Sequence, residues 1–112
     1  MSVFILEESW MNNQQNYYGQ ITKLTIGNGI AAIGDYAFAK LEYVTEISIP
    51  EGVLTIGVDS FSDCKALTEI CLPEGLHTIS DYAFQRCQAL ATIRFPDSLQ
   101  KIGGFAFLFE EK

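Results

Sequence analysis

A period of 23 residues runs through most of the 112-residue chain. When the chain is aligned on this period, residues of one kind fall into columns, and one column consists of phenylalanine alone. The clearest columns are Phe38, Phe61, Phe84 and Phe107; Ile33, Ile56, Ile79 and Ile102; Leu24, Ile47, Ile70 and Ile93; and Ile21, Val44, Leu67 and Leu90. Because a unit this short cannot bury its own apolar face, the period predicts a stack of equivalent units.

The period divides the chain into four units and a shorter N-terminal segment. The units are 21–43, 44–66, 67–89 and 90–112. Residues 1–20 match the pattern poorly, since Gln15 falls in the phenylalanine column and Trp10 in an isoleucine column. Terminal repeats of stacked proteins are commonly atypical, so we expect 1–20 to be a divergent cap with a strand at Ser2–Leu6. The whole chain then forms one domain.

Each unit predicts two short extended pieces followed by a turn. In "LTEICLP" (67–73) apolar and polar residues alternate from Thr68 onward, and the proline ends the strand. "PEG" is turn chemistry, and a second extended piece places Leu76 and Ile79 inward. "SDYAF" offers a Ser/Asp cap for a short helical or 3₁₀ turn, whose Phe84 fills the coil from the opposite side.

The repeat resembles the BspA-type leucine-rich repeat, with the pattern "LxxIxIPxxVxxIGxxAFxxC". The segments "VTEISIPEGVLTIGVDSFSDC" (44–64) and "LTEICLPEGLHTISDYAFQRC" (67–87) carry the resemblance, which covers 21–112. It implies an α/β solenoid: a right-handed leucine-rich-repeat stack with a parallel β-sheet on one side and short helical or 3₁₀ turns on the other. Proteins of this kind are mostly microbial, often surface-exposed, and act in adhesion or other protein interactions. The repeat carries no catalytic residue.

The resemblance and the N-terminus point to different locations. The resemblance suggests a bacterial cell-surface or secreted protein. The N-terminal "MSVFILEESW" lacks the features of a signal peptide, because its apolar run is short and acidic residues follow at once. Taken alone, the chain reads as cytoplasmic, and no apolar window has the length of a membrane span.

Composition argues against several classes of partner. Acidic residues outnumber basic ones 14 to 7, for a net charge of −7, so we expect no nucleic-acid partner. With three cysteines, no C-x-x-C pair and one histidine, we expect neither a zinc site nor another cofactor.

The stretch "IGNGIAAIGDYAF" (26–38) contains a G-x-G, which raises the alternative of a phosphate-binding loop. The same glycines recur along the repeat, which a single phosphate site would not require. Gly52 and Gly75 match Gly29, and Gly57 and Gly103 match Gly34. We therefore interpret them as turn glycines that allow unusual backbone angles.

The cysteines occupy two kinds of position. Cys64 and Cys87 share one column a single coil apart, within reach of a disulfide, but Leu41 serves in the same column and favours free thiols. Cys71 points outward from its strand. His77 falls in a column of mixed residue types and is expected to face solvent, so a Cys71–His77 catalytic pair has little support.

Two outward columns of the predicted sheet form the candidate protein-binding face. The columns are Lys23, Glu46, Glu69 and Thr92, and Thr25, Ser48, Cys71 and Arg94. Solenoid sheet faces are common binding surfaces. A plain solvated face is the alternative, because Arg94 is the only residue there of the types that dominate binding energy.

The last unit provides a second candidate, an end-on interface. Its residues are Phe105, Phe107, Leu108 and Phe109. A solenoid end exposes apolar core unless something covers it, so we expect a second copy or further repeats there.

Together these patterns predict a non-enzymatic, adhesion-like protein-interaction module that binds through the sheet face or the solenoid ends. The alternative is a structural spacer within a longer surface protein, and an enzyme is a distant third.

Overall fold

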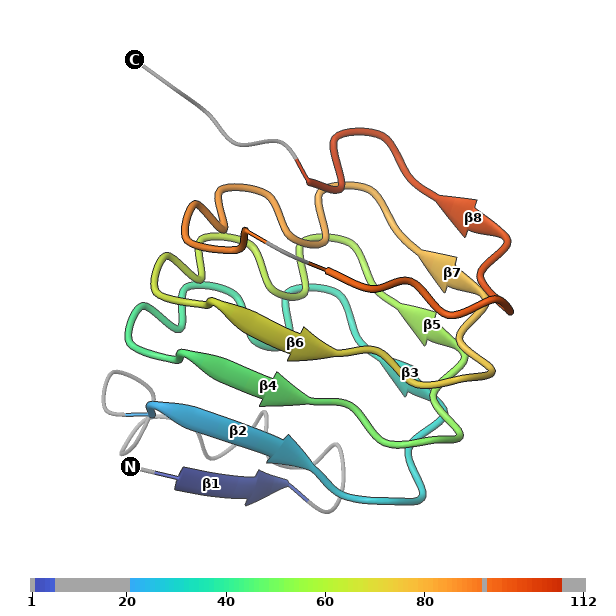
Figure 1. Cartoon of the computed structure of the whole chain (residues 1–112), viewed down its shortest axis with the longest axis horizontal. Coiled ribbons are helices and arrows are strands. Elements are labelled where there is room, and N and C mark those ends of the chain that lie inside the picture. Colours follow the sequence, from blue (N-terminus) through green and yellow to red (C-terminus); the bar gives the residue numbers. More distant parts are fainter. Residues whose placement is uncertain (1, 6–20, 92, 108–112) are drawn as a thin grey trace.

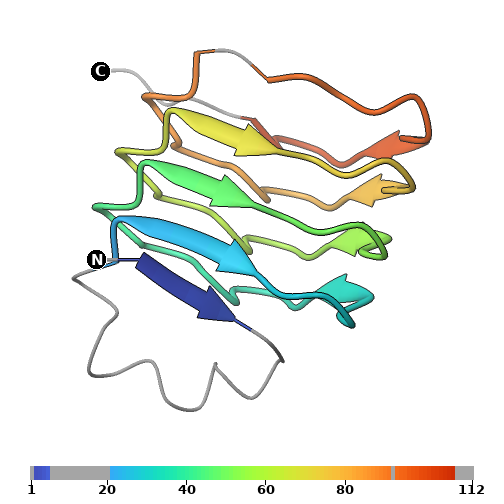
Figure 2. The same cartoon turned by 60° about the horizontal axis from the view of Figure 1, so that its bottom comes forward.

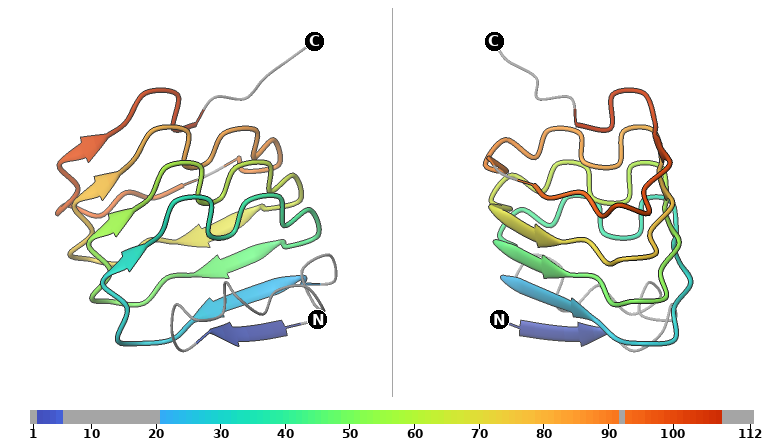
Figure 3. Two further views of the ribbon diagram at one scale, coloured as in Figure 1. Left: turned by 180° about the vertical axis from the view of Figure 1, so that it is seen from behind. Right: turned by 45° about the vertical axis from the view of Figure 1, so that its right-hand side comes forward.

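A computed structural model describes residues 2–5, 21–91 and 93–107, and in this part of the chain the strands form two parallel sheets (Figure 1). Sheet A has the order β1–β2–β4–β6 and sheet B the order β3–β5–β7–β8. The strands are β1 Ser2–Ile5, β2 Lys23–Ile26, β3 Ala32–Ile33, β4 Glu46–Ser48, β5 Thr55–Ile56, β6 Glu69–Cys71, β7 Thr78–Ile79 and β8 Lys101–Ile102. The chain passes from one sheet to the other and back in each coil, which makes a parallel-strand solenoid (Figure 3).

The 23-residue period is the stacking register. In sheet A, Leu24 pairs with Ile47 and Ile47 with Ile70. In sheet B, Ile33 pairs with Ile56 and Ile79 with Ile102. β1 also lies parallel to β2, and most of the predicted cap, residues 6–20, lies outside the described residues. The division into a cap and four units stays a prediction.

The third side of each coil is a turn. The expected helical or 3₁₀ segment is absent from the described residues, and 35–40, 58–63 and 81–86 are turns instead. Tyr36 and Lys40 have φ of 60° and 66°, which no right-handed helix accommodates. The amides of Tyr36, Phe38 and Lys40 donate to the next coil's Val58, Ser60 and Ser62 carbonyls at 2.9, 2.8 and 2.8 Å. These amides bond between coils rather than within a helix.

The core confirms the aliphatic and phenylalanine columns in the first three coils, whereas Ile102 of the fourth is exposed. Phe61 and Phe84 are fully buried, as are Leu24, Ile47, Ile56 and Ile79. The rings of Phe38, Phe61, Phe84 and Phe107 stack along the solenoid with centroids 5.6, 5.3 and 5.1 Å apart. Each ring therefore packs on the coils next to it, and we call this column the phenylalanine spine.

The glycines divide into two groups with different causes. Gly29, Gly52 and Gly75 have φ of 97°, 103° and 97°, so these are turn glycines as expected. The same interpretation is wrong for Gly57 and Gly103, which do not have positive φ. A Cβ at Gly57 would lie 2.6 Å from Asp35 Oδ1 and 2.7 Å from the Ile33 carbonyl oxygen. The close approach of the preceding coil, rather than backbone freedom, requires glycine at this position.

Candidate protein-interaction surface

The outer face of sheet A holds the two predicted columns. Lys23, Glu46 and Glu69 lie side by side on β2, β4 and β6, and Thr25, Ser48 and Cys71 form the neighbouring column. All six are half-buried or exposed, whereas the residues between them point into the core. The parallel register produces this arrangement because side chains alternate between the faces of a strand.

Charge is spread along the first column of this face. Lys23 Nζ lies 3.6 Å from Glu46 Oε2, and both side chains are about half exposed. Such an exposed pair contributes at most about 1 kcal/mol. Glu46 also pairs directly with Glu69 across the sheet, which sets two like charges side by side. The face is thus polar and mildly acidic, and no aromatic side chain projects from its described columns.

The fourth coil does not extend the two columns in the expected way. Thr92 lies outside the described residues. Arg94 is exposed, but it belongs to no strand, and within the described part of the chain sheet A ends at β6. Figure 2 shows the segment that follows residue 92 separated from β6, at the top of the stack. Arg94 therefore stands apart from Cys71 instead of directly beside it.

A row of three aromatic residues lies on the turn side, and of these the sequence pointed only to Phe105, as part of the end-on interface. Tyr36, Tyr82 and Phe105 occupy the same position in their coils and are 63%, 36% and 61% exposed. Asp59 holds this position in the second coil, and all four residues have φ between 56° and 62°. The Tyr82 and Phe105 rings stack at 5.7 Å. We call these three residues the aromatic row, and a column of Tyr, Asp, Tyr and Phe at the 23-residue period was its signal in the sequence.

Asp59 couples electrostatically to the aromatic row. Its negative charge, together with a hydrogen bond from the phenol, raises the pKa of Tyr36 above the ordinary value of 10.0. The Tyr36 hydroxyl therefore keeps its proton to a higher pH than an ordinary tyrosine does.

The candidate end-on interface is partly described. Phe107 is half-buried against Phe84, and Phe105 belongs to the aromatic row. Leu108 and Phe109 lie outside the described residues. Ile102 and Phe95 are 45% and 40% exposed, so the last described coil presents apolar side chains. Coverage of this end by a second copy or by further repeats stays a prediction.

The three cysteines are free thiols in this structure. Cys64 and Cys87 are buried, and their thiols donate to the carbonyl oxygens of Phe38 and Phe61 at 3.5 and 3.1 Å. A hydrogen bond to the Cys87 thiol, together with burial, raises the pKa of Cys64. Cys71 is exposed on sheet A, whereas exposed His77 precedes β7 of sheet B, so the two belong to different sides of the coil.

The sequence pattern of the BspA-type leucine-rich repeat region matches residues 11–111 in six copies. The chain belongs to this family. Repeats of this family are generally non-enzymatic and bind proteins.

Two solved structures have a similar fold. A leucine-rich repeat protein from Bacteroides ovatus is 27% identical, with a TM-score of 0.80 over 96% of this chain and 28% of that one. The leucine-rich repeat protein of T. pallidum is 22% identical, with a TM-score of 0.65 over 96% of this chain and 59% of that one. The BspA-type chain thus spans less than two thirds of each. A comparison with curated proteins gives no match.

The described residues of this BspA-type chain contain no group of three His, Cys, Asp or Glu residues placed to hold a metal ion. None of their segments forms a helix long and apolar enough to cross a membrane.

Proposed function

We propose that the chain is a non-enzymatic protein-interaction module that binds a partner protein through the aromatic row. The observation that carries this proposal is the exposure of Tyr36 and Phe105, each more than 60%, at equivalent positions of the stack. Tyrosine and phenylalanine are enriched at protein interfaces, and tyrosine is among the residues that contribute most binding energy. The family supports the general role, and adhesion at a bacterial surface is its proposed specific form.

The backbone beneath the aromatic row supports this assignment. The amide of Tyr36 donates to the Val58 carbonyl, and that of Tyr82 to the Gly104 carbonyl, at 2.9 and 3.1 Å. These bonds between coils fix the backbone from which the side chains project, which lowers the entropic cost of binding. The sheet A face lacks such anchors, so we assign it a smaller share of the binding energy.

Paired substitutions test which face binds. The double variant Tyr36→Asn/Tyr82→Asn removes two rings, and asparagine tolerates positive φ, as Asp59 does in the same row. The matched control Glu46→Gln/Glu69→Gln removes two charges from sheet A. Partners captured from extracts of the source cells are identified by mass spectrometry, and their affinity for each purified variant is then measured. We expect the asparagine variant to lose at least tenfold in affinity.

The opposite pattern contradicts the proposal. A partner that binds the asparagine variant as well as it binds the unmodified protein, but loses affinity for the glutamine variant, would move the site to sheet A. Unchanged thermal unfolding of both variants is the control for folding.

A structural spacer is the second candidate function. The lengths of the two similar solved chains favour it, because each is considerably longer than this stack. A spacer predicts that no captured partner responds to substitution on either face.

A further inference from the structure

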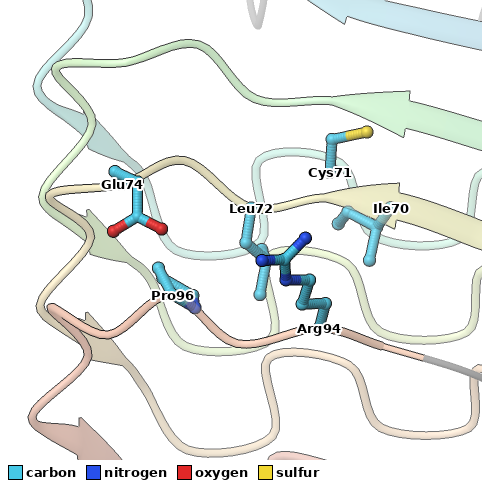
Figure 4. A pocket seen from close by; sticks show the side chains of 6 residues that line it. All are labelled: Ile70, Cys71, Leu72, Glu74, Arg94 and Pro96. Atoms are coloured by element: carbon cyan, nitrogen blue, oxygen red, sulfur yellow. The ribbon is translucent and has the colours of Figure 1, made fainter.

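A hollow of about 300 Å³ separates β6 from the segment 93–96. Its lining residues are Ile70, Cys71, Leu72, Glu74, Arg94 and Pro96, and Figure 4 shows the Arg94 side chain beside Leu72. A second, more open hollow is lined by Thr68 and Glu69 and shares Ile70 and Arg94 with the first. The two together make a groove along the whole of β6, which we call the edge groove.

The edge groove lies where, among the described residues, the hydrogen-bond ladder of sheet A stops. The amide of Thr45 donates to the Thr22 carbonyl at 2.8 Å, and that of Thr68 to the Thr45 carbonyl at 3.0 Å. The equivalent donor in the fourth coil is the amide of Ala91. Within the described residues this amide makes no backbone bond, and neither do the amides of Leu72 and Arg94.

The other two sides of the same coil remain attached. The amide of Gln100 donates to the His77 carbonyl at 2.8 Å, and on the turn side that of Phe84 donates to the Ala106 carbonyl at 2.7 Å. Ser98 Oγ accepts from the Gly75 amide at 2.8 Å and donates to the Leu76 carbonyl at 2.9 Å. The fourth coil is therefore held on sheet B and on the turn side, whereas its described amides along β6 make no bond to the third coil.

The fourth coil also differs from the other three in the residue beside the groove, which is aromatic instead of aliphatic. Phe95 falls in the column of Ile26, Ile49 and Leu72, and its ring packs edge-on against Phe107 with centroids 5.7 Å apart. The aliphatic side chains of the first two coils are buried at this position, whereas Phe95 is 40% exposed. The larger Phe95 side chain thus occurs in the one described segment of this column, 93–96, that is separated from the preceding coil.

The chemistry of the groove selects an extended peptide. An unpaired strand edge is a template for a further strand, whose backbone supplies the missing acceptors for Leu72 and Arg94. Ile70 and Leu72 provide an apolar wall. The Arg94 guanidinium has no ion-pair partner among the described residues and is suited to receive a carboxylate. Glu69 and Glu74 flank the groove, so a strand with several acidic side chains would be repelled.

We propose that the edge groove binds an extended strand of a partner protein, with one carboxylate facing Arg94 and an apolar side chain facing Leu72. This site goes beyond the proposed role of the aromatic row, which lies on the turn side. Either site can fail without the other, because Arg94 and Leu72 contribute nothing to the aromatic row.

Peptide titration followed by NMR tests the proposal. The probe is the acetylated and amidated hexapeptide Thr-Val-Glu-Ile-Thr-Val, added to the ¹⁵N-labelled full chain. We expect the amide signals of Leu72 and Arg94 to shift and their hydrogen exchange to slow when the peptide binds. Arg94→Gln should weaken binding about tenfold, the amount expected for a charge-assisted bond. A peptide with Gln in place of Glu should bind the unmodified protein and Arg94→Gln equally, with the weaker affinity expected for Arg94→Gln and the Glu peptide.

Controls separate strand pairing from general adhesion of the peptide. A peptide N-methylated at alternate residues cannot form the ladder and should not bind. Arg94 is exposed, and thermal unfolding of Arg94→Gln checks that its fold is retained.

Four results would overturn the proposal. Amides of Leu72 and Arg94 already as protected as that of Ile47 in the free protein would show that the chain closes the edge itself. If the amide signals of Leu72 and Arg94 shifted with protein concentration in the absence of peptide, a second copy of the chain would be the partner that binds this edge. Equal binding of the Glu and Gln peptides would show that Arg94 does not receive a carboxylate. Shifts confined to the aromatic row would show that the peptide does not bind in the edge groove.

Discussion

The Asp35 carboxylate occupies the space that a side chain at Gly57 would need. A Cβ at Gly57 would approach Asp35 Oδ1 to 2.6 Å, and the same oxygen accepts the Val58 amide at 2.9 Å. This Asp–Gly arrangement recurs two coils later, with Asp81, Gly103 and the Gly104 amide at 2.8 Å, whereas the intervening interface pairs Val58 with Ser80. Glycine is therefore found where the preceding coil supplies an aspartate.

Exchanging one pairing for the other tests this relationship. We expect Gly57→Ser to lower the free energy of unfolding by about 1–3 kcal/mol, because a side chain is forced into an occupied space. Adding Asp35→Val reproduces the Val58–Ser80 pairing and should restore much of the loss. Urea unfolding of both single variants and the double variant measures the coupling. Strict additivity of the two changes would contradict the account.

Ser60 predicts a stabilising substitution. Its hydroxyl is fully buried and has no hydrogen-bond partner among the residues that the structure describes, whereas the same column holds alanine at Ala37 and Ala83. We expect Ser60→Ala to raise the free energy of unfolding by about 1 kcal/mol, since an unpaired buried hydroxyl is costly. Ser62→Ala is the matched control, because Ser62 Oγ donates to the Asp59 carbonyl at 3.3 Å. A loss of stability in Ser60→Ala would show that the hydroxyl has a partner.

The cysteines predict selective alkylation. Cys71 is exposed, whereas Cys64 and Cys87 are buried, and a raised pKa keeps the Cys64 thiol protonated at neutral pH. Iodoacetamide at pH 7.5 should modify Cys71 alone in the folded protein and all three thiols in urea. Mass spectrometry gives the count, and Cys71→Ser should remain unmodified when folded. Rapid modification of that variant would contradict the burial of the other two thiols.

From the raised pKa of Tyr36 we expect the stability of the folded protein to depend on pH in the alkaline range. The Asp59 carboxylate raises the pKa of Tyr36 above 10.0, so Asp59→Asn should lower it towards that value. Because the folded-state pKa exceeds the unfolded one, the stabilisation from this pair is complete below the unfolded pKa. It is lost as pH rises through the folded pKa. NMR titration of the Tyr36 ring measures both proteins. If the pKa of Tyr36 were unchanged in Asp59→Asn, the Asp59 carboxylate would not be the cause of the raised pKa.

The interior of this protein follows from its sequence more directly than its surfaces do. The aliphatic columns and the phenylalanine spine recur at one period, and stacking at that period brings Ile47 and Ile70 together as expected. The turn was mistaken for a helical segment because "SDYAF" resembles a helix cap in local sequence. The competing bonds, such as that from Phe38 to Ser60, run between coils and leave no local signature.

The candidate sites show the same limit. Equal spacing placed Arg94 beside Cys71, but spacing alone cannot reveal that Arg94 belongs to no strand and that, in the described part of the chain, sheet A ends at β6. The aromatic row was visible as a column, yet the outward direction of Tyr36 and Tyr82 depends on their positive φ, which the sequence does not show.

The most direct test of the stacked coil is the unfolding free energy of Phe84→Ala. Phe84 is fully buried, and its ring stacks on both Phe61 and Phe107. Removal of the ring should cost about 3–5 kcal/mol, and the half-buried Phe107 should cost less when changed to Ala. Urea unfolding of the two variants beside the unmodified protein provides the measurement. A cost below about 1 kcal/mol for Phe84→Ala would contradict the phenylalanine spine, and with it the frame that displays both proposed binding sites.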